Sequence, residues 1–571
     1  MTSSAVPAVD QKRSHREILI ALSGLIMGMF VAVLSGTVVS TSLPLIIADL
    51  GGDQAAFTWV ITASLLATAV STPIWGKLSD LLDRKLLLQL ALSLFVLGTV
   101  AAGFSQSTTM LIALRVVQGI GVGGLMSLVF VAVALIISPR ERGKYMGIVG
   151  GIMAVATIGG PLIGGLITDA FGWRANFFIG LPFAIAALII IQKTLHLPRS
   201  TRTKVSIDYL GAVLLTVGVS LLLIWVSMGG SQFEWDSMTS YLLIGISVLA
   251  LAAFVLTEFL VTEPIVPMSL FKNRTFTLAV IASIAVGVAM IATSVFLAQY
   301  FQLARGANPT QSGLMTIPMV VGQLLASIII GQLISRFGKW KGWLITGSAL
   351  VLAGVALLST LRYDTDFLWV SAYMVILGAG LGMVMQNLTL VVQNDTPIEQ
   401  LGAASANVNF FRSVSGAVGV TIMGSILASQ VTTHITSSLA KFTPSSSAEI
   451  DALKELATGN LPRVSELPDA IRVIVESAYG LGIAESFMVA VPLAFISLIA
   501  VIFLPNKALS TKTASQTLAE EAEAAAIDLA EAEIGASATS SAQVASSDGA
   551  EAAPSTGSVT VIERERQGGD R

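Results

Sequence analysis

Long uncharged apolar segments recur along the sequence and limit what the chain can fold into. An apolar segment of about 20 residues can cross a bilayer as an α-helix, because its backbone polar groups are then hydrogen-bonded within the segment. With 54% hydrophobic and only 12% charged residues, this chain of 571 residues has too few polar side chains to cover a water-soluble globule. The sequence therefore predicts an all-α integral membrane protein.

We expect fourteen helices that cross the membrane. The first segment is too long for the hydrophobic part of a signal peptide and lacks a small-residue cleavage site where one is needed, so we expect it to remain as a span. Cysteine is absent, which excludes disulfides, thiol nucleophiles and thiolate metal sites. The predicted spans are Ile18–Ser42, Ala56–Trp75, Leu86–Phe104, Met110–Ile136, Tyr145–Thr168, Asn176–Gln192, Tyr209–Met228, Tyr241–Val261, Phe276–Phe301, Gln311–Ser335, Gly342–Leu361, Phe367–Val392, Ala404–Gln430 and Phe487–Leu504.

Lysine and arginine are unevenly distributed between alternate connections. The short connections on one side contain only Arg174, Arg305 and Arg362. The positive-inside rule therefore places the other side, with both termini, in the cytoplasm. We expect the protein to lie in the plasma membrane. The lysines and arginines on that side are Lys12, Arg13, Arg16, Lys77, Arg84, Lys85, Arg140, Arg142, Lys144, Lys193, Arg199, Arg202, Lys204, Lys272, Arg274, Arg336, Lys339 and Lys341.

A short charged sequence occurs twice, 255 residues apart. "GKLSDLLDRK" (Gly76–Lys85) lies between the second and third predicted helices, and "GQLISRFGKWK" (Gly331–Lys341) lies between the tenth and eleventh. This repeat predicts two six-helix bundles related by a parallel duplication, with two helices inserted between them. In such an architecture the substrate site lies between the bundles, near the middle of the membrane.

The duplication also predicts the domain boundaries. The long outer connection should contain two short helices, around Ala448–Ala457 and Leu467–Ala478. The predicted boundaries are residues 1–17 for a cytoplasmic N-terminus, 18–195 for the first bundle, 196–262 for a linker and the inserted helices, 263–504 for the second bundle with an outer loop at 431–480, and 505–571 for an acidic, largely disordered cytoplasmic tail.

Asp80, in the first copy of the charged sequence, stands near the start of the third predicted helix. A carboxylate there can accept hydrogen bonds from free N–H groups and interacts favourably with the helix dipole. Arg84 and Lys85 can pair with acids or helix ends of a neighbour in one conformation and release them in another. The alternative, that Lys77, Arg84 and Lys85 only fix topology, does not explain Asp80.

Two further motifs lie inside predicted helices. "RVVQG" places Arg115 in the fourth helix, where a guanidinium is costly unless it faces a wet or paired interior; alternatively, it reaches the outer interface. "GGPLIGG" in the fifth helix contains Pro161, which removes a backbone donor, and glycines that permit close helix contacts. Finally, "NFFRSVSGAVGV" (Asn409–Val420) places Arg412 within a span, and "EPIVPMSLFKNRTF" (Glu263–Phe276) precedes the ninth helix.

These sequences resemble motifs of the major facilitator superfamily, in particular of its fourteen-helix drug:proton antiporters of the QacA/EmrB type. The resemblance covers roughly residues 34–504 and implies a major facilitator fold, with secondary active export as the activity. It also implies that the charged loop acts as a conformational latch and the glycine–proline element as a hinge. The latch residues are then Gly76, Asp80, Arg84, Lys85, Gly331, Arg336 and Lys339, and the hinge residues are Gly160, Pro161, Gly164 and Gly165.

Members of this group often have an aspartate early in the first helix, but here that position is Ser35. Every predicted span lacks a carboxylate near its middle. Because an uncompensated dication would lose several kcal/mol per ion in such an interior, we expect neutral or anionic amphiphiles, including lipids, as substrates. Proton coupling is implied by the resemblance, and the residues expected to take part in proton or substrate coupling are Asp49, Asp80, Arg115, Gln118, Glu258 and Arg412.

The expected substrate cavity is lined by amides and aromatic rings, although the amides could instead only join helices. Its predicted lining residues are Phe30, Gln299, Tyr300, Gln386, Asn387, Asn407, Phe410 and Phe411.

The sequence thus favours an exporter of hydrophobic compounds over other functional classes, with export of one endogenous lipid or secondary metabolite as the alternative. A membrane-embedded enzyme is disfavoured because His15, His196 and His434 all lie outside the predicted spans, and no Ser/His/Asp, thiol or metal-ligand cluster can be assembled within the spans. An ATP-driven pump is disfavoured because G-x-x-x-x-G-K-[ST] does not occur. A channel fits the two-bundle repeat poorly. We expect no cofactor, metal or nucleic acid, and a monomer.

Overall fold

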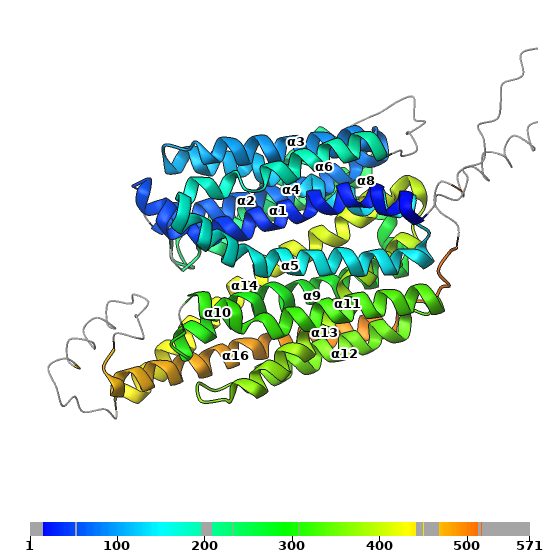
Figure 1. Ribbon diagram of the computed structural model, residues 1–571. Coiled ribbons are helices and arrows are strands. Elements are labelled where there is room, and N and C mark those ends of the chain that lie inside the picture. Colours follow the sequence, from blue (N-terminus) through cyan, green and yellow to red (C-terminus); the bar gives the residue numbers. More distant parts are fainter. Residues whose placement is uncertain are drawn as a thin grey trace, which may run out of the picture. The chain divides into compact units, whose positions relative to one another are not determined.

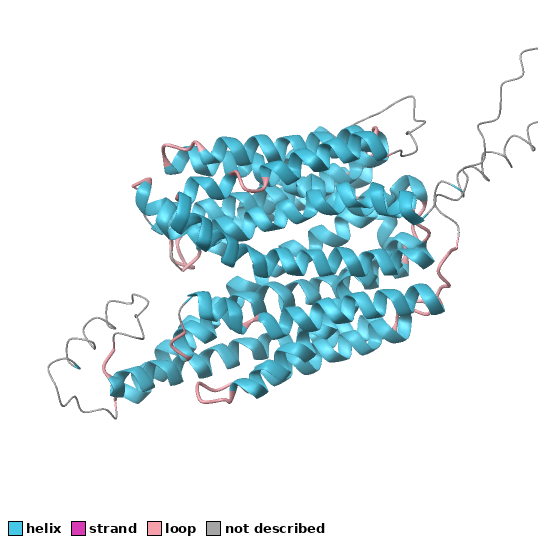
Figure 2. Cartoon of the chain, in the orientation of Figure 1, coloured by secondary structure: helices cyan, strands magenta, loops and turns pink. Residues whose placement is uncertain are grey.

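Fourteen long helices form the membrane part of the chain within the residues that the structure describes. The computed structural model describes residues 15–511 apart from 52–53, 196–207, 231, 308 and most of 441–466 (Figure 1). The described chain consists of helices joined by loops (Figure 2). Its only β-type pairing is one bridge between Gly229 and Phe233. Thirteen helices are long and apolar enough to cross a bilayer, and α5 (Pro139–Phe171), with 33 residues, is the fourteenth. The predicted all-α membrane fold is confirmed.

The first bundle contains six helices whose ends follow local capping signals. Asp83 accepts hydrogen bonds from the N–H groups of Lys85 and Leu86 at the start of the third helix, and Ser107 does the same for Met110 in the fourth. The helices are α1 (His15–Asp49), α2 (Gln54–Leu81), α3 (Arg84–Gly103), α4 (Thr108–Ile136), α5 (Pro139–Phe171) and α6 (Leu181–Thr194), and the 3-10 turn η1 (Trp173–Phe177) precedes α6.

The second bundle repeats the first in its helix neighbours. The pair α2 and α4 corresponds to α11 and α13, the pair α1 and α5 to α9 and α14, and the pair α1 and α6 to α9 and α16. This agreement confirms the predicted duplication. The helices are α9 (Arg274–Gln299) with its π-helical end η3 (Tyr300–Ala304), the short α10 (Pro309–Met315), α11 (Ile317–Phe337), α12 (Lys341–Leu358), α13 (Phe367–Asn394), α14 (Leu401–Leu439) and α16 (Asp469–Ile502).

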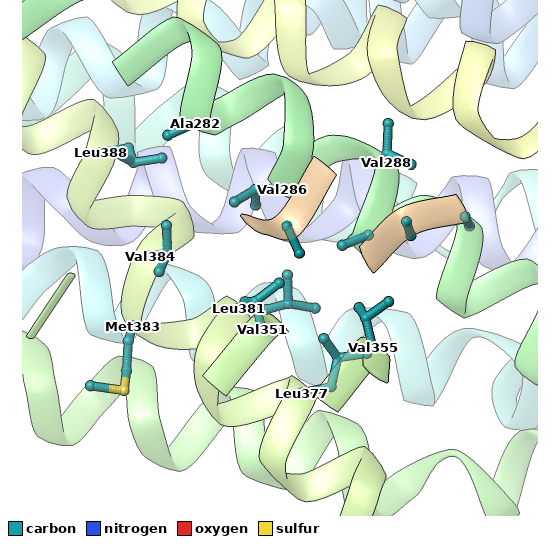
Figure 3. Close-up of a cluster of buried hydrophobic side chains, with 14 of the residues drawn as sticks. Ala282, Val286, Val288, Val351, Val355, Leu377, Leu381, Met383, Val384 and Leu388 are labelled. Atoms are coloured by element: carbon teal, nitrogen blue, oxygen red, sulfur yellow. The ribbon is translucent and has the colours of Figure 1, made fainter. Parts of the chain in front are cut away.

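The interior of the second bundle is apolar and closely packed. Side chains from α9, α12 and α13 meet there, among them Val286, Val351, Val355, Leu377 and Leu381, all at most 1% exposed (Figure 3). Residues from three separate helices therefore share one core, which favours movement of the bundle as a unit.

The inserted helices α7 (Tyr209–Met228) and α8 (Met238–Leu260) pack against each other on one flank. α7 also contacts α2 of the first bundle and α14 of the second. Leu215 and Val219 of α7 share an apolar cluster with Val70 of α2 and Phe410 of α14. α8 exposes large apolar side chains such as Leu249 and Leu256, as expected for a surface that faces lipid.

The predicted outer loop at 431–480 is wrong in its extent. α14 continues to Leu439 and α16 begins at Asp469, so helix occupies both ends of the supposed loop. With 39 and 34 residues, both helices exceed the roughly 20 residues that a bilayer requires. The predicted short helix at Leu467–Ala478 is the first part of α16, whereas Ala448–Ala457 and most of the predicted termini lie outside the described residues.

Candidate functional site

The two bundles meet along two symmetry-related seams. α2 packs against α14 in one seam, and α5 packs against α11 in the other. Hydrogen bonds across these seams gather at the end of the helices where α2 and α11 end and α5 and α14 begin, which we call the latch rim. The latch rim contains both copies of the charged sequence.

Asp80 caps a helix of the opposite bundle. Its Oδ1 accepts the N–H of Gly402 and its Oδ2 the N–H of Ala403, both at 2.9 Å, in the first turn of α14. Gln400, at the usual capping position of α14, makes no such bond with its side chain. The expectation that Asp80 would serve the start of the third helix is therefore wrong, because Asp83 caps that helix. Asp80 satisfies free N–H groups across the seam instead.

Glycines allow the helices of this seam to touch. A Cβ atom on Gly76 would lie 2.8 Å from the carbonyl oxygen of Gly402 and would overlap Ala406. A Cβ on Gly402 would likewise collide with Gly76, Ser79 and Asp80. Both positions therefore need glycine for the backbones to approach closely enough for the Asp80 contact.

The second copy of the charged sequence keeps the glycine contact but replaces the carboxylate. A Cβ on Gly143 of α5 would lie 2.9 Å from the carbonyl oxygen of Gly331 in α11. The position equivalent to Asp80 is Ser335, whose carbonyl accepts a hydrogen bond from Arg140 at 3.4 Å, as does the carbonyl of Arg336. A cation from the start of α5 thus neutralises free carbonyls at the end of α11. Lys339, a predicted latch residue, is exposed.

A buried network behind the seams was missed by the sequence analysis, which counted Arg142 only as a topology charge. Its guanidinium donates to Gln393 Oε1 at 2.7 Å and to the carbonyls of Ala134 and Ile137. Gln393 donates in turn to Ser405 at 2.8 Å. The network joins α4 and α5 to α13 and α14. The only sequence signal for this network was Gly143, the residue after Arg142. Like Gly402, it lies near the start of a helix that meets the opposite bundle.

The remaining charges of the first copy make other contacts. Lys77 pairs with Glu263, in the linker that follows α8, at 2.6 Å. Lys85 donates to the Gln192 carbonyl and so joins α3 to α6 within the first bundle, rather than joining the two bundles. Arg84 is buried at the start of α3. Glu258 folds the same linker, since it accepts the N–H groups of Ile265 and Val266.

Both predicted intramembrane arginines are buried and held by neutral partners. Arg115 donates to Gln118 at 2.6 Å, and Gln118 donates in turn to Ser35 and Thr99. Arg412 donates to the Met385 carbonyl and to Asn409. Within the described residues, neither guanidinium forms an ion pair. The guanidinium groups of Arg115 and Arg412 therefore each place a positive charge in the interior of the membrane part.

The predicted lining residues occupy different surroundings. Gln386 is 4% exposed and lies beside Gly150 of α5, between the bundles, and its Oε1 has no hydrogen-bond partner among the described residues. Asn387 and Asn407 donate to carbonyls of their own helices. Tyr300 is fully buried in the second bundle and donates to the Arg362 carbonyl, so the structure does not place it on a cavity.

The aromatic lining residues are also separated. Phe410 and Phe411 pack with the cluster around α7, on the flank of the molecule. Phe30 and Gln299 are half-buried, one in each bundle. Of the predicted lining residues, Gln386 thus has the clearest position between the bundles.

Comparison with known proteins gives the family. The model described as Major Facilitator Superfamily matches residues 25–420. The chain belongs to the Major Facilitator Superfamily. It is 36% identical over 418 residues to the multidrug transporter protein MdtP of Bacillus subtilis, covering 73% of this chain and 76% of that one. It is also 29% identical to multidrug resistance protein 3 of the same organism, covering 86% of this chain and 96% of the relative.

Solved structures support the fold of this major facilitator protein. The crystal structure of the human organic anion transporter MFSD10 (TETRAN) superposes with a TM-score of 0.54 at 14% identity, covering 83% of this chain and 99% of that one. The proton:xylose symporter XylE gives 0.51 at 17% identity, covering 86% and 96%. The chain is therefore a membrane transporter in fold and family.

The glycine–proline element of the transporter lies inside the first bundle. α5 continues through Pro161 as one helix. A Cβ on Gly160 would collide with Thr37, and one on Gly164 would contact Val38, both in α1, whereas Gly165 has open space beside it. The element packs α5 on α1, away from the α5–α11 contacts at the latch rim.

Asp49 lies at the rim opposite the latch rim and ties together parts of the first bundle. Its Oδ2 accepts hydrogen bonds from Trp173 at 2.9 Å and from Arg174 at 3.1 Å. These two bonds, that from Trp173 first, hold the pKa of the Asp49 carboxyl below its ordinary value.

The structure also places a carboxylate inside a long helix, where none was expected. Because α16 begins at Asp469, Glu485 lies near its middle. Because α14 continues to Leu439, His434 lies within that helix, and its Nε2 is 3.2 Å from Glu485 Oε1. The expectation that no helix has a carboxylate near its middle is therefore wrong, and His434, although outside the predicted span Ala404–Gln430, lies within α14. The mixed polar sequence before Phe487 hid the start of α16.

Proposed function

We propose that the transporter is a secondary active exporter of hydrophobic or amphiphilic compounds, coupled to protons by antiport. The observation that carries the proposal is the cap that Asp80 of one bundle places on α14 of the other. Such a contact has to break whenever the bundles separate at the latch rim, so it favours one of two alternating conformations. The names of the two Bacillus relatives support export of drugs.

The lysine and arginine distribution favours a cytoplasmic position for the latch rim and for both termini, in the plasma membrane. The structure then corresponds to a state closed toward the cytoplasm. In this orientation a substrate leaves the region between the bundles toward the outer side, and the latch must open before the next molecule enters from within. We propose that a single chain performs this cycle.

We further propose that neutral or anionic amphiphiles are preferred over dications. Arg115 and Arg412 are buried without a carboxylate partner in the described part of the chain, so a dication would add charge to an already positive interior. The same arginines favour the second candidate function, which is export of one endogenous lipid or secondary metabolite. Gln118 and Gln386 offer polar contacts near this region.

The test uses purified transporter in liposomes and dyes of graded charge. We expect an uncharged dye such as Nile red to be transported when a pH gradient is imposed, and a dication such as propidium to be transported much less. Arg412→Gln should reduce the difference between the transport rates of Nile red and propidium, because it removes one buried positive charge. Preference for propidium would contradict the substrate assignment, and transport indifferent to the pH gradient would contradict proton antiport. Transport of only one compound class from a broad panel would favour the second candidate.

A further inference from the structure

The outer parts of α14 and α16 form a closely packed helix pair. A Cβ on Gly482 of α16 would lie 2.9 Å from the side chain of Val431 in α14. One turn further on, Ser486 donates to the Met423 carbonyl at 3.2 Å. Beside these contacts, His434 of α14 faces Glu485 of α16. The proton coupling proposed above has no assigned carboxylate in this bundle.

The geometry at Glu485 is that of a carboxylate with half of its hydrogen bonds made. Oε1 lies 3.2 Å from His434 Nε2, while Oε2 is buried and has no partner among the described residues. A buried acceptor without a donor destabilises the ionised form unless a cation or a proton joins it. The side chains of His434 and Glu485 are 27% and 39% exposed, so protons can reach the pair.

The other charged groups at this end of the second bundle have partners of their own. Arg472 lies 2.8 Å from Asp469 and 3.9 Å from Glu476, in the first turns of α16. In the elements packed against α16, Arg305 follows η3 and donates to the Thr365 carbonyl, and Arg362 and Asp364 follow α12. In the described part of the chain, His434 is the cationic group paired with Glu485.

We propose that His434 and Glu485 form the site at which the transporter binds its coupling proton from the outer side; this rests on the proposed proton antiport. With the imidazole protonated, the pair is an ion pair that holds α14 against α16. Release of that proton leaves a neutral imidazole beside a carboxylate whose charge is uncompensated, so the two helices are held less tightly. Imidazole is suited to this exchange because it can be either a neutral ring or a cation with an N–H donor on both nitrogens.

One helix connects this site to the latch. α14 begins at the turn that Asp80 caps and passes His434 as a single helix. The 32 residues from Gly402 to His434 span about 48 Å at the rise of an α-helix. A change in how α14 rests on α16 therefore shifts the turn that Asp80 holds. Proton binding at one end and bundle separation at the other are then coupled through a rigid element.

The test compares Glu485→Gln and His434→Gln with Glu476→Gln, a control that removes a carboxylate from the same part of α16. Each variant is purified, checked by gel filtration, and placed in liposomes. Nile red exchange without a pH gradient reports substrate passage, and uptake driven by an imposed gradient reports coupling. We expect both site variants to exchange dye as wild type does but to lose gradient-driven uptake, while Glu476→Gln retains both activities.

The outcomes separate this inference from the proposed function. If wild-type uptake itself ignores the pH gradient, proton antiport fails and the site fails with it. If wild type responds and both site variants respond equally, antiport stands and the assignment to His434 and Glu485 is overturned. If both exchange and driven uptake are lost in both variants although they elute as folded protein, the pair is a structural tie, which also overturns the assignment.

Discussion

At the scale of single residues, the position of Asp80 shows how much of a site can be predicted from sequence. Its residue type and its place in a glycine-containing repeat predicted a capping carboxylate. Its partners, Gly402 and Ala403, follow more than 300 residues later, and nothing local to either segment indicates the contact. Arg142 was missed for the same reason, because its buried partner Gln393 lies in another bundle.

Asp80→Asn should weaken the closed latch rim. Asparagine has one acceptor oxygen, so an N–H group would face an amide N–H instead of an oxygen, and the charge that favours the helix start is lost. We expect the closed rim to lose about 1–2 kcal/mol of stability relative to the open rim. This changes the ratio of the closed to the open population roughly 5- to 30-fold. Double electron–electron resonance between labels on cysteines introduced at Leu86 and Lys339 measures the separation, and the native chain has no cysteine to interfere.

The matched control is Asp83→Asn, which makes the same chemical change at the residue that caps α3 inside the first bundle. It should leave the distance distribution unchanged. An identical distribution in wild type and Asp80→Asn would show that the Asp80 cap does not hold the rim.

Asp49 predicts a pH dependence of stability with a defined sign. Its pKa is lowered in the folded protein, so its contribution is present above the ordinary value of 3.8 and is lost as the pH falls through the lowered pKa. The melting temperature of Asp49→Asn should therefore lie below that of wild type by a constant amount between about pH 5 and pH 8, and the gap should close only in stronger acid. If the difference in melting temperature disappears already near neutral pH, the ionised Asp49 carboxylate is not the group that stabilises the fold.

At the scale of helices, periodicity and hydropathy predicted the number and order of spans but misjudged the ends of α14 and α16. The sequence "SQVTTHITSSL" at the end of α14 is polar, and hydropathy cannot distinguish a helix that leaves the bilayer from a loop. The duplicated glycines were more informative. Gly76 and Gly331 each meet a glycine of the opposite bundle, although only one of the two seams retains the carboxylate.

Gly76→Ala should force α2 away from α14. The added methyl group would meet the Gly402 carbonyl and Ala406, both of them part of α14 and unable to move independently. We expect transport of Nile red in liposomes to fall well below wild type, with the rim distance increased. Gly245→Ala in α8, where nothing lies within 4 Å, is the matched control and should transport normally. Normal transport by Gly76→Ala would show that close contact here is dispensable.

At the scale of the whole molecule, the repeat and the composition were sufficient for the fold because they reflect physical requirements that act along the entire chain. Each span must satisfy its own backbone in lipid, and each bundle must bury the same helix pairs. The functional contacts were less predictable, since they depend on which helix ends meet across the seams. For example, the sequence placed Arg115 and Arg412 within helices, but only the structure shows that their hydrogen-bond partners are neutral groups.

The inserted helix α7 makes the two flanks of the molecule unequal. It packs over the junction of α2 with α14, whereas α5 and α11 form the related junction. When the bundles rock, Leu215 and Val219 must either slide over one partner helix or travel with it. Because α7 covers the α2–α14 junction and leaves the α5–α11 junction to its own two helices, we expect the two bundles to rock asymmetrically, with the smaller displacement on the α7 flank.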